Sequence, residues 1–256
     1  MKATLKDRID NFGSIASTRL MPKLPVIIVV NGRSFNNATA LIDKPFSDGL
    51  AKALCAGMMA LVQEIGGAVF GYQFDDEIVI ISRNDQTLDT QPWCNNDTQK
   101  ITSIASSVAT LNFNSYVASN DLANFSSATF YSYAFVVPNI TEATNLLVFK
   151  QQQAFQSSVR NACFYELLKR NHNEGDIETM LENTSNEDKI ALLAQECGIE
   201  FDKAYPAVFK RGAACYRVPK TVEYQGIISE KMGWKLDAGL PIFTKDVGFL
   251  SQIFGV

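Results

Sequence analysis

The segment that most restricts the fold of this chain is residues 25–30, which read Pro-Val-Ile-Ile-Val-Val and lead directly into Asn31-Gly32-Arg33. Such a near-continuous run of apolar β-formers predicts a strand that is buried on both faces. Asn-Gly is a turn signal, and a glycine lets the backbone approach a ligand, so that its carbonyl is available as a hard oxygen ligand. The strand therefore predicts a central sheet, with a polar corner at its end that carries no carboxylate.

Hydrophobic periodicity predicts the other elements. We expect helices over residues 2–11, 46–65, 100–113 and 141–169, and a further helix that begins at Ser185. We expect strands over residues 68–73, 77–82, 129–137, 213–217 and 221–228, and the first two of these should form a hairpin. Helices and strands mix without strict alternation, which favours an α+β fold, a sheet with helices packed on one side. A body of about 140 residues, followed by a helical and β C-terminal part, is the expected partition.

Composition narrows the class of protein. The chain has 256 residues, 46% of them hydrophobic, enough for one elaborated domain or two small ones. Its apolar runs are far shorter than the roughly 20 residues of a membrane helix, so we expect a cytoplasmic protein with no membrane contact. The chain has a net charge of −4, so it lacks the excess of basic residues found in many nucleic-acid-binding proteins. A local basic group is either a solvated face or an RNA contact: Lys203, Lys210, Arg211, Arg217 and Lys220.

Cysteine and histidine exclude several kinds of site. The five cysteines are widely spaced and contain no C-x-x-C pair, which argues against a disulfide framework or a thiolate zinc site. The single histidine, His172, lies in a polar stretch typical of a surface loop. His-rich metal sites are therefore excluded, and a Ser-His-Asp mechanism would have to use this one residue.

Three consecutive acids, Asp75-Asp76-Glu77, separate the two strands of the expected hairpin. Charges at such a place are costly unless they lie at an exposed turn or bind a cation, and the residues alone favour the exposed turn. Magnesium sites for phosphoryl transfer use one or two carboxylates with backbone or substrate oxygens, and paired ions hold the attacking and leaving oxygens. A strand end with an acid beside an acidic hairpin is the arrangement of a polymerase palm.

A set of ordered segments resembles the tRNA(His) guanylyltransferase family from residue 1 to about residue 245. These segments are Asn31-Gly32-Arg33-Ser34-Phe35, Lys44-Pro45-Phe46, Asp75-Asp76-Glu77, Lys100-Ile101-Thr102-Ser103, Lys150-Gln151-Gln152, Gly198-Ile199-Glu200-Phe201, Pro206 and Phe209-Lys210-Arg211-Gly212. The stretch after Lys150-Gln151-Gln152 is most similar to the guanylyltransferase-like branch.

The resemblance implies a palm related to those of DNA polymerases and nucleotide cyclases. It implies that residues 1–140 form the palm-like core and that residues 141–256 complete the same catalytic domain. The implied activity adds nucleotides in the 3′ to 5′ direction to the 5′ end of tRNA or a related RNA, with GTP and ATP as substrates and two Mg²⁺ ions. The family tends to form dimers or tetramers.

The resemblance also implies roles for individual residues. Catalysis would involve Asp76, Glu77 and Asn31. The metal ligands would be Asn31, Gly32 through its carbonyl, Asp76 and Asp75. Nucleotide and phosphate contacts would come from Arg33, Phe35, Lys44, Lys100 and Lys150, and RNA contacts from Lys210 and Arg211.

The chain departs from the family pattern where charge is expected. Asn31 replaces an Asp, Asn36 a His, Gln153 an acid, and Tyr131 and Tyr133 an Asp and an Arg. An amide oxygen can coordinate Mg²⁺ but supplies no negative charge. The corner is therefore compensated by Asp75 across a turn or bulge, impaired, or deliberately substituted. Three functions stay open: an active nucleotidyltransferase, a nucleotide-binding module with reduced catalysis, and an enzyme that acts on free nucleotides.

Overall fold

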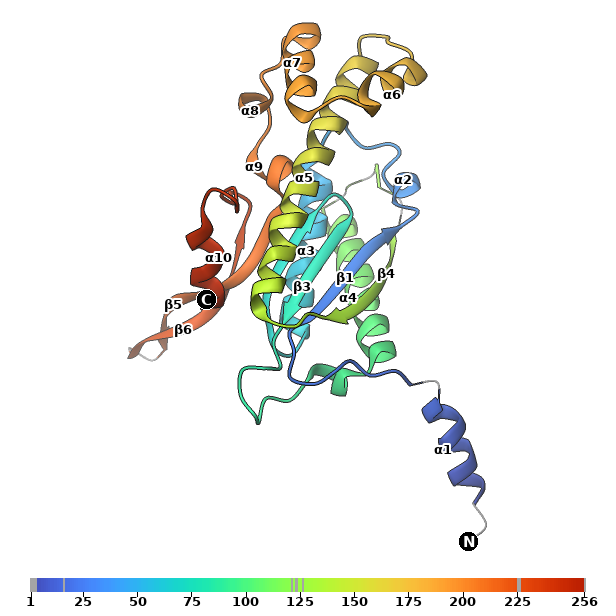
Figure 1. The fold of residues 1–256 in the computed structure, drawn as a ribbon, viewed down its shortest axis with the longest axis vertical. Coiled ribbons are helices and arrows are strands. Elements are labelled where there is room, and N and C mark those ends of the chain that lie inside the picture. Colours follow the sequence, from blue (N-terminus) through green and yellow to red (C-terminus); the bar gives the residue numbers. More distant parts are fainter. Residues whose placement is uncertain are drawn as a thin grey trace.

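The computed structural model describes residues 4–15, 17–120, 122, 124–125, 127–224 and 227–255 (Figure 1). The helices are α1 Leu5–Ile15, α2 Phe35–Ala38, α3 Asp48–Glu64, the 3₁₀ turn η1 Trp93–Asn96, α4 Thr98–Ser119, α5 Ile140–Leu168, α6 Glu174–Glu182, α7 Asn186–Cys197, α8 Phe201–Ala204, α9 Ala207–Arg211 and α10 Val247–Phe254. The strands are β1 Val26–Arg33, β2 Ala68–Phe74, β3 Glu77–Ser82, β4 Thr129–Val136, β5 Ala213–Tyr224 and β6 Ile227–Asp237.

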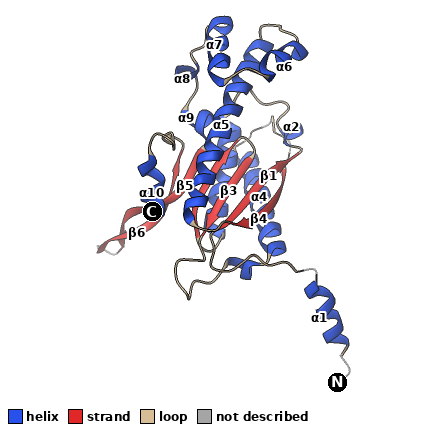
Figure 2. Cartoon of the chain, in the orientation of Figure 1, coloured by secondary structure: helices blue, strands red, loops and turns tan. Residues whose placement is uncertain are grey.

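The strands form one antiparallel sheet in the order β4-β1-β3-β2-β5-β6 (Figure 2). β1 lies inside the sheet, and its residues 26–30 are at most 4% exposed, which confirms the predicted two-sided burial. β2 and β3 form the predicted hairpin, with Phe74 opposite Glu77 and only Asp75 and Asp76 in the turn. The sheet therefore brings the acidic turn to the same end as the polar corner of β1.

Helices cover both faces of the sheet. Ile28 and Val30 face a core built with α3 and α4, whereas Ile27 and Val29 face a second core built with α5 and α10. In Figure 1, α5 crosses one face of the strands while α4 lies behind them. The prediction of helices on one side was therefore wrong, because successive side chains of a wholly apolar strand point to opposite faces and both need cover.

The long helix α5 connects the sheet to a separate helical cluster. Its 29 residues span about 43 Å, so its first half packs on the sheet and its second half contacts α6, α7 and α8. The predicted start of α7 is confirmed, because the Asp188 amide donates to the Ser185 hydroxyl at 3.1 Å. The chain then returns to the sheet through α9 and β5.

Two predicted elements have different bounds. The expected strand 213–217 and residues 221–224 of the next expected strand belong to a single strand, β5. Residues 227 and 228 begin β6, which continues to Asp237. Residues 225 and 226, within the second predicted range, lie outside the described residues. The first helix begins at Leu5 and extends to Ile15, beyond the predicted end at residue 11.

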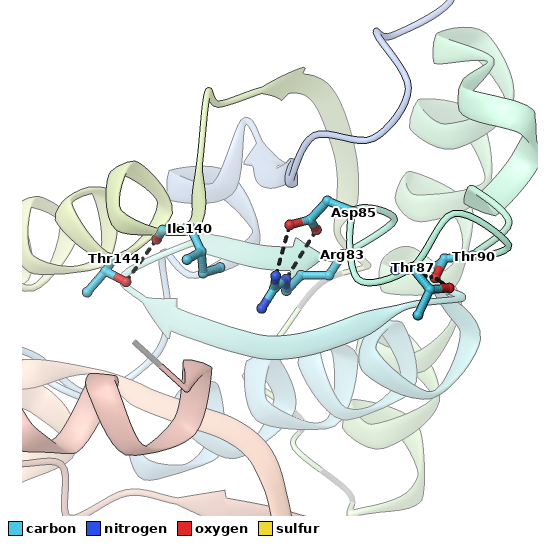
Figure 3. A network of polar contacts seen from close by, with 6 residues as sticks. All are labelled: Arg83, Asp85, Thr87, Thr90, Ile140 and Thr144. Carbon is cyan, nitrogen blue, oxygen red and sulfur yellow. Dashed lines mark hydrogen bonds and ion pairs between the residues drawn. The ribbon is translucent and has the colours of Figure 1, made fainter.

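The loop after β3 lies at the end of the sheet opposite the acidic turn. Arg83 pairs with Asp85 at 2.9 Å. Figure 3 shows this ion pair and the hydrogen bond between Thr87 and Thr90. Lys23 Nζ donates to three backbone carbonyls of the same loop at 2.8–2.9 Å. These contacts hold the loop between β3 and α4.

In the part of the chain that the structure describes, no helix combines the length and the apolar content needed to cross a membrane.

Gly212 joins α9 to β5 directly behind the acidic hairpin. Its φ of +72° and ψ of −169° lie in a region used almost only by glycine, and an added Cβ would lie 2.3 Å from the Gln73 carbonyl oxygen. We expect Gly212→Ala to lower the free energy of unfolding by more than about 2 kcal/mol, measured by urea denaturation.

Gly198→Ala is the matched control, because Gly198 also has a positive φ of +67° but its added Cβ would meet no atom within 4 Å. It should cost about 1 kcal/mol, the strain of the left-handed backbone alone. Equal losses in the two variants would contradict the close approach of Gly212 to the hairpin.

Candidate active site

The end of β1 and the acidic turn are joined by their backbones. The Gly32 amide donates to the Asp76 carbonyl at 3.0 Å, and Asn31 lies opposite Glu77 in the register of β1 and β3. Asp75, the first residue of the turn, has a φ of +45°. Two segments more than 40 residues apart therefore meet at the corner that the sequence predicted.

The side chains at this corner divide between the two faces of the sheet. Asn31 continues the alternation of Ile27 and Val29, so it lies on the face covered by α5. Glu77 lies on that face too, and Lys150 of α5 pairs with it at 2.7 Å. Both side chains are largely buried, at 13% and 12% exposure. The charge of Lys150 is thus already matched by Glu77.

A pocket of about 320 Å³ opens beside the acidic turn. Asp75 and Asp76 form part of its wall, together with Lys44 from the segment before α3. Much of the rest is aromatic and comes from distant parts of the chain: Phe35, Phe46, Phe74, Tyr165 and Phe209. Phe46 and Phe209 stack with ring centroids 5.0 Å apart, so the pocket combines flat apolar surfaces with charged groups of both signs.

Two side chains hold Asp75 in place. Ser157 of α5 donates its hydroxyl proton to Asp75 Oδ2 at 2.5 Å, and Gln73 Nε2 donates to the Asp75 carbonyl at 3.2 Å. Gln73 is itself only 4% exposed and accepts a weak hydrogen bond from the Cys55 thiol. Both the backbone and the carboxylate of Asp75 are therefore fixed by groups from outside the turn.

The electrostatics of the turn favour a cation. Desolvation by the surrounding protein raises the pKa of the Asp75 carboxyl, although the residue as a whole is exposed at the turn. The hydrogen bond from Ser157 lowers this pKa in part, and the charge of Glu77 raises it. Burial is also the main cause that raises the pKa of Asp76, with Asp75 and Glu77 adding to it. Burial lowers the pKa of Lys44. Crowded carboxyls of this kind gain stability when a positive ion binds near them.

The donor atoms at the corner fit a hard divalent cation. Among the described residues, no group of three or more His, Cys, Asp or Glu side chains is placed to hold a metal ion. The carboxylates of Asp75 and Asp76 line the pocket, whereas the predicted ligands Asn31 and Gly32 are not among its lining residues. Mg²⁺ binds through one or two carboxylates and completes its coordination with substrate phosphates and water, so the pair of Asp75 and Asp76 fits such an ion.

Several predicted residues lie elsewhere or have other roles. Lys100 is in the first turn of α4, whose start is bound to the segment before β1, at the opposite end of the sheet. Lys210 is only 9% exposed and donates to the Asp202 carbonyl at 2.8 Å, so its prediction as an RNA contact is not supported. Arg33 is exposed, whereas Phe35 is buried against Phe113 and Phe130 while still lining the pocket.

Arg211, the other predicted RNA contact, is half-buried. Its Nε atom is buried and has no hydrogen-bond partner among the described residues. Its backbone carbonyl accepts a hydrogen bond from the Tyr72 hydroxyl at 2.7 Å.

Sequence reasoning predicted Lys150 of α5 but missed three further residues that this helix supplies to the site. Ser157, Asn161 and Tyr165 recur every fourth position, and the last two line the pocket while Ser157 binds Asp75. A polar stripe at helical spacing was the available signal. Gln73 was missed because it sits in a strand, where an inward-facing amide is not distinguishable from a solvent-facing one.

The sheet, the acidic turn and the adjoining pocket define a protein of the predicted α+β class, with an acidic site at one end of an antiparallel sheet. The family model described as "tRNAHis guanylyltransferase" matches residues 6–138, and the model described as "Thg1 C terminal domain" matches residues 142–237. The chain belongs to the tRNA(His) guanylyltransferase family.

Two curated relatives come from Arabidopsis thaliana. Its tRNA(His) guanylyltransferase 1 is 22% identical over 218 residues, which cover 83% of this chain and 37% of that protein. Its tRNA(His) guanylyltransferase 2 is 23% identical over 208 residues, which cover 80% of this chain and 38% of that protein. This chain therefore spans less than two fifths of the length of these relatives.

Solved structures match the chain more completely. A bacterial tRNA(His) guanylyltransferase-like protein in complex with ATP is 27% identical with a TM-score of 0.82, over 99% of this chain and 100% of that one. One in complex with GTP is 26% identical with a TM-score of 0.74, over the same shares. The enzyme from Saccharomyces cerevisiae shares the fold, at 18% identity and a TM-score of 0.70, over 87% of this chain and 95% of that one.

The ion pair between Lys150 and Glu77 should matter for stability. Lys150→Met leaves the Glu77 carboxylate largely buried without its cation, which we expect to lower the free energy of unfolding by about 3 kcal/mol or more. Urea denaturation measures the loss, and adding Glu77→Gln should recover part of it.

Arg160→Met is the comparison, since Arg160 and Glu178 form an exposed pair, with side chains 44% and 51% accessible. Its loss should not exceed about 1 kcal/mol. A loss for Lys150→Met as small as that of Arg160→Met would mean that water screens the inner pair.

Proposed function

We propose that this protein is a Mg²⁺-dependent nucleotidyltransferase that adds nucleotides in the 3′ to 5′ direction to the 5′ end of a tRNA or related RNA. The observation that carries the proposal is the acidic turn of Asp75 and Asp76 in the wall of a pocket that also holds Lys44. Family membership and the end-to-end match to proteins solved with ATP and GTP support a nucleoside triphosphate as the occupant.

The lining of the pocket suits the two ends of such a nucleotide. Phe46, Phe209 and Tyr165 offer ring surfaces on which a base can stack. Lys44, whose ammonium lies 5.4 Å from the centre of the Tyr165 ring, can neutralise phosphate charge at the rim. The volume of about 320 Å³ is at the lower end of small-molecule sites, so part of the nucleotide would remain open to the RNA end.

The metal ligands in this proposal are Asp75, Asp76, the Gly32 carbonyl and the Asn31 amide. When bound there, Mg²⁺ supplies charge neutralisation for the phosphates and lowers the pKa of the attacking hydroxyl. Asp75 can contribute because it lies in the turn and not on a strand, where neighbouring side chains would point to opposite faces. Glu77, paired with Lys150, would influence the electrostatic potential at the end of β1.

We further propose that the two parts of the chain form one palm-like catalytic domain, with residues 1–140 as its core and residues 141–256 completing it. Two contacts support this: β2 of the first part pairs with β5 of the second, and α5 of the second part packs on β1 and β3. A homo-oligomer, a dimer or tetramer, is part of the same proposal, and size-exclusion chromatography with light scattering tests it.

Asp76 is the residue on which activity should depend most. We expect Asp76→Ala to lower transfer by at least about 100-fold, because a metal ligand is worth more than the outer-shell groups whose loss costs 10- to 100-fold. The assay is Mg²⁺-dependent incorporation of α-labelled GTP or ATP into a 5′-monophosphorylated tRNA transcript that lacks its first nucleotide.

The matched control for this variant is Asp89→Ala, which removes an exposed acid in the loop after β3, at the other end of the sheet. It should retain full transfer. Full activity in Asp76→Ala would remove the metal site from the mechanism.

Asn31 should set how much Mg²⁺ the protein needs. We expect Asn31→Asp to lower the Mg²⁺ concentration for half-maximal transfer by about tenfold or more, since a full charge a few ångströms from an ion contributes more than 1 kcal/mol at partly buried sites. Asn37→Asp makes the same change at an exposed position of α2 and should leave the Mg²⁺ dependence unaltered. An identical shift in both variants would point to net charge as the cause.

A second function, nucleotide binding with little or no turnover, is favoured by one observation. The chain replaces charged family positions at the corner and beside it, with Asn31 next to Tyr131 across β1 and β4. If the natural chain binds GTP or ATP but transfers nothing, and Asn31→Asp restores transfer, this second function is the correct one. Turnover without any RNA would instead favour an enzyme that acts on free nucleotides.

A further inference from the structure

The helix α5 supplies a hydroxyl to the acidic turn from 82 residues away in the sequence. Ser157 Oγ donates to Asp75 Oδ2 at 2.5 Å, and Asn161 Nδ2, one turn further along α5, approaches the same hydroxyl at 3.5 Å. Figure 1 shows α5 passing beside the hairpin of β2 and β3. Since Asn161 and Asp75 both line the pocket, Ser157 lies between two groups that face the same space.

Asp75 needs external support to keep its conformation. Its φ of +45° is in the left-handed region, which costs a residue with a Cβ about 1–2 kcal/mol. Gln73 supports the backbone through the Asp75 carbonyl, but it leaves the side chain free to rotate. The carboxylate is held by Ser157 alone among the described residues.

The geometry of this hydrogen bond determines which oxygen remains available. A serine hydroxyl has one proton, and here it is given to Oδ2 of Asp75. Within the described part of the chain, Oδ1 of the same carboxylate accepts no hydrogen bond. One oxygen is thus anchored to α5, and the other is left for a ligand in the pocket.

We propose that Ser157 is a positioning residue of this site, whose hydroxyl holds the Asp75 carboxylate where it supplies the negative charge that Asn31 lacks. The inference rests on the proposed function and adds to it the reason why an amide at the first metal position can be tolerated. It makes the cation affinity of the site depend on a side chain that does not touch the cation.

The test measures Mn²⁺ binding to the full chain by electron paramagnetic resonance, without nucleotide or RNA. Ser157→Ala should weaken Mn²⁺ binding by about tenfold or more, as removal of an outer-shell partner does. Ser157→Thr keeps the hydroxyl and should bind Mn²⁺ within about twofold of the natural chain. Circular dichroism and urea unfolding verify that both variants fold.

Ser158→Ala is the matched control. Ser158 is the next residue on α5, is 1% exposed, and its hydroxyl has no partner among the described residues, so the same chemical change there does not reach Asp75. Its Mn²⁺ affinity should equal that of the natural chain. Equal weakening in Ser157→Ala and Ser158→Ala would overturn the inference, because it would indicate a general disturbance of α5.

A double-mutant cycle isolates the route through Asp75. Asp75→Asn should weaken Mn²⁺ binding, and adding Ser157→Ala to it should weaken binding no further, because the two changes remove the same contribution. An undiminished effect of Ser157→Ala in the Asp75→Asn background would overturn the inference.

The same measurements separate this inference from the proposed function. If Ser157→Ala and Asp75→Asn both bind Mn²⁺ normally while Asp76→Ala loses Mn²⁺ and nucleotide transfer, the role of Ser157 is wrong and the proposed function stands. If the natural chain neither binds Mn²⁺ nor transfers nucleotides, both are wrong.

Discussion

The structure depends on the two-sided burial of β1. Its apolar side chains alternate between a core shared with α3 and α4 and a core shared with α5 and α10, so neither helix layer can be removed without exposing one face. The same strand ends in Asn31, Gly32 and Arg33, where apolar packing stops and polar groups begin. The site therefore lies where β1 extends beyond the two hydrophobic cores that cover its faces.

The departures from the family pattern change the charge balance at that end of the sheet. Lys150 is matched by Glu77, which leaves Asp75 and Asp76 without a protein cation of their own among the contacts described. The raised pKa values of both carboxyls have burial as their main cause and their acidic neighbours as a further one. An Asp at position 31 would have added a further negative charge to this crowded corner, and Asn31 reduces that repulsion while lowering the attraction for a cation.

The long helix α5 supplies side chains to several parts of this site. It carries Lys150 to Glu77, Ser157 to Asp75, and Asn161 and Tyr165 to the pocket, while its second half is held by α6, α7 and α8. Gln151 on the same helix accepts from the Phe243 amide at 2.7 Å and donates to the Pro241 carbonyl, which attaches the C-terminal segment. A rigid helix anchored at both ends is a better support for a carboxylate than a loop would be.

The sequence by itself determined what depends on neighbours along the chain. Periodicity and turn residues predicted β1, the hairpin with Asp75 and Asp76 in its turn, the length of α5 and the Ser185 cap, because these rest on local backbone preference and on alternation of apolar residues. Only the tertiary structure decided that helices cover both faces, that Lys210 is buried and Lys100 lies at the far end, and that Ser157 meets Asp75. The physical reason is that local preference acts only between neighbours along the chain. Packing of distant segments decides which side chains lie on the same face, form an ion pair or form a hydrogen bond.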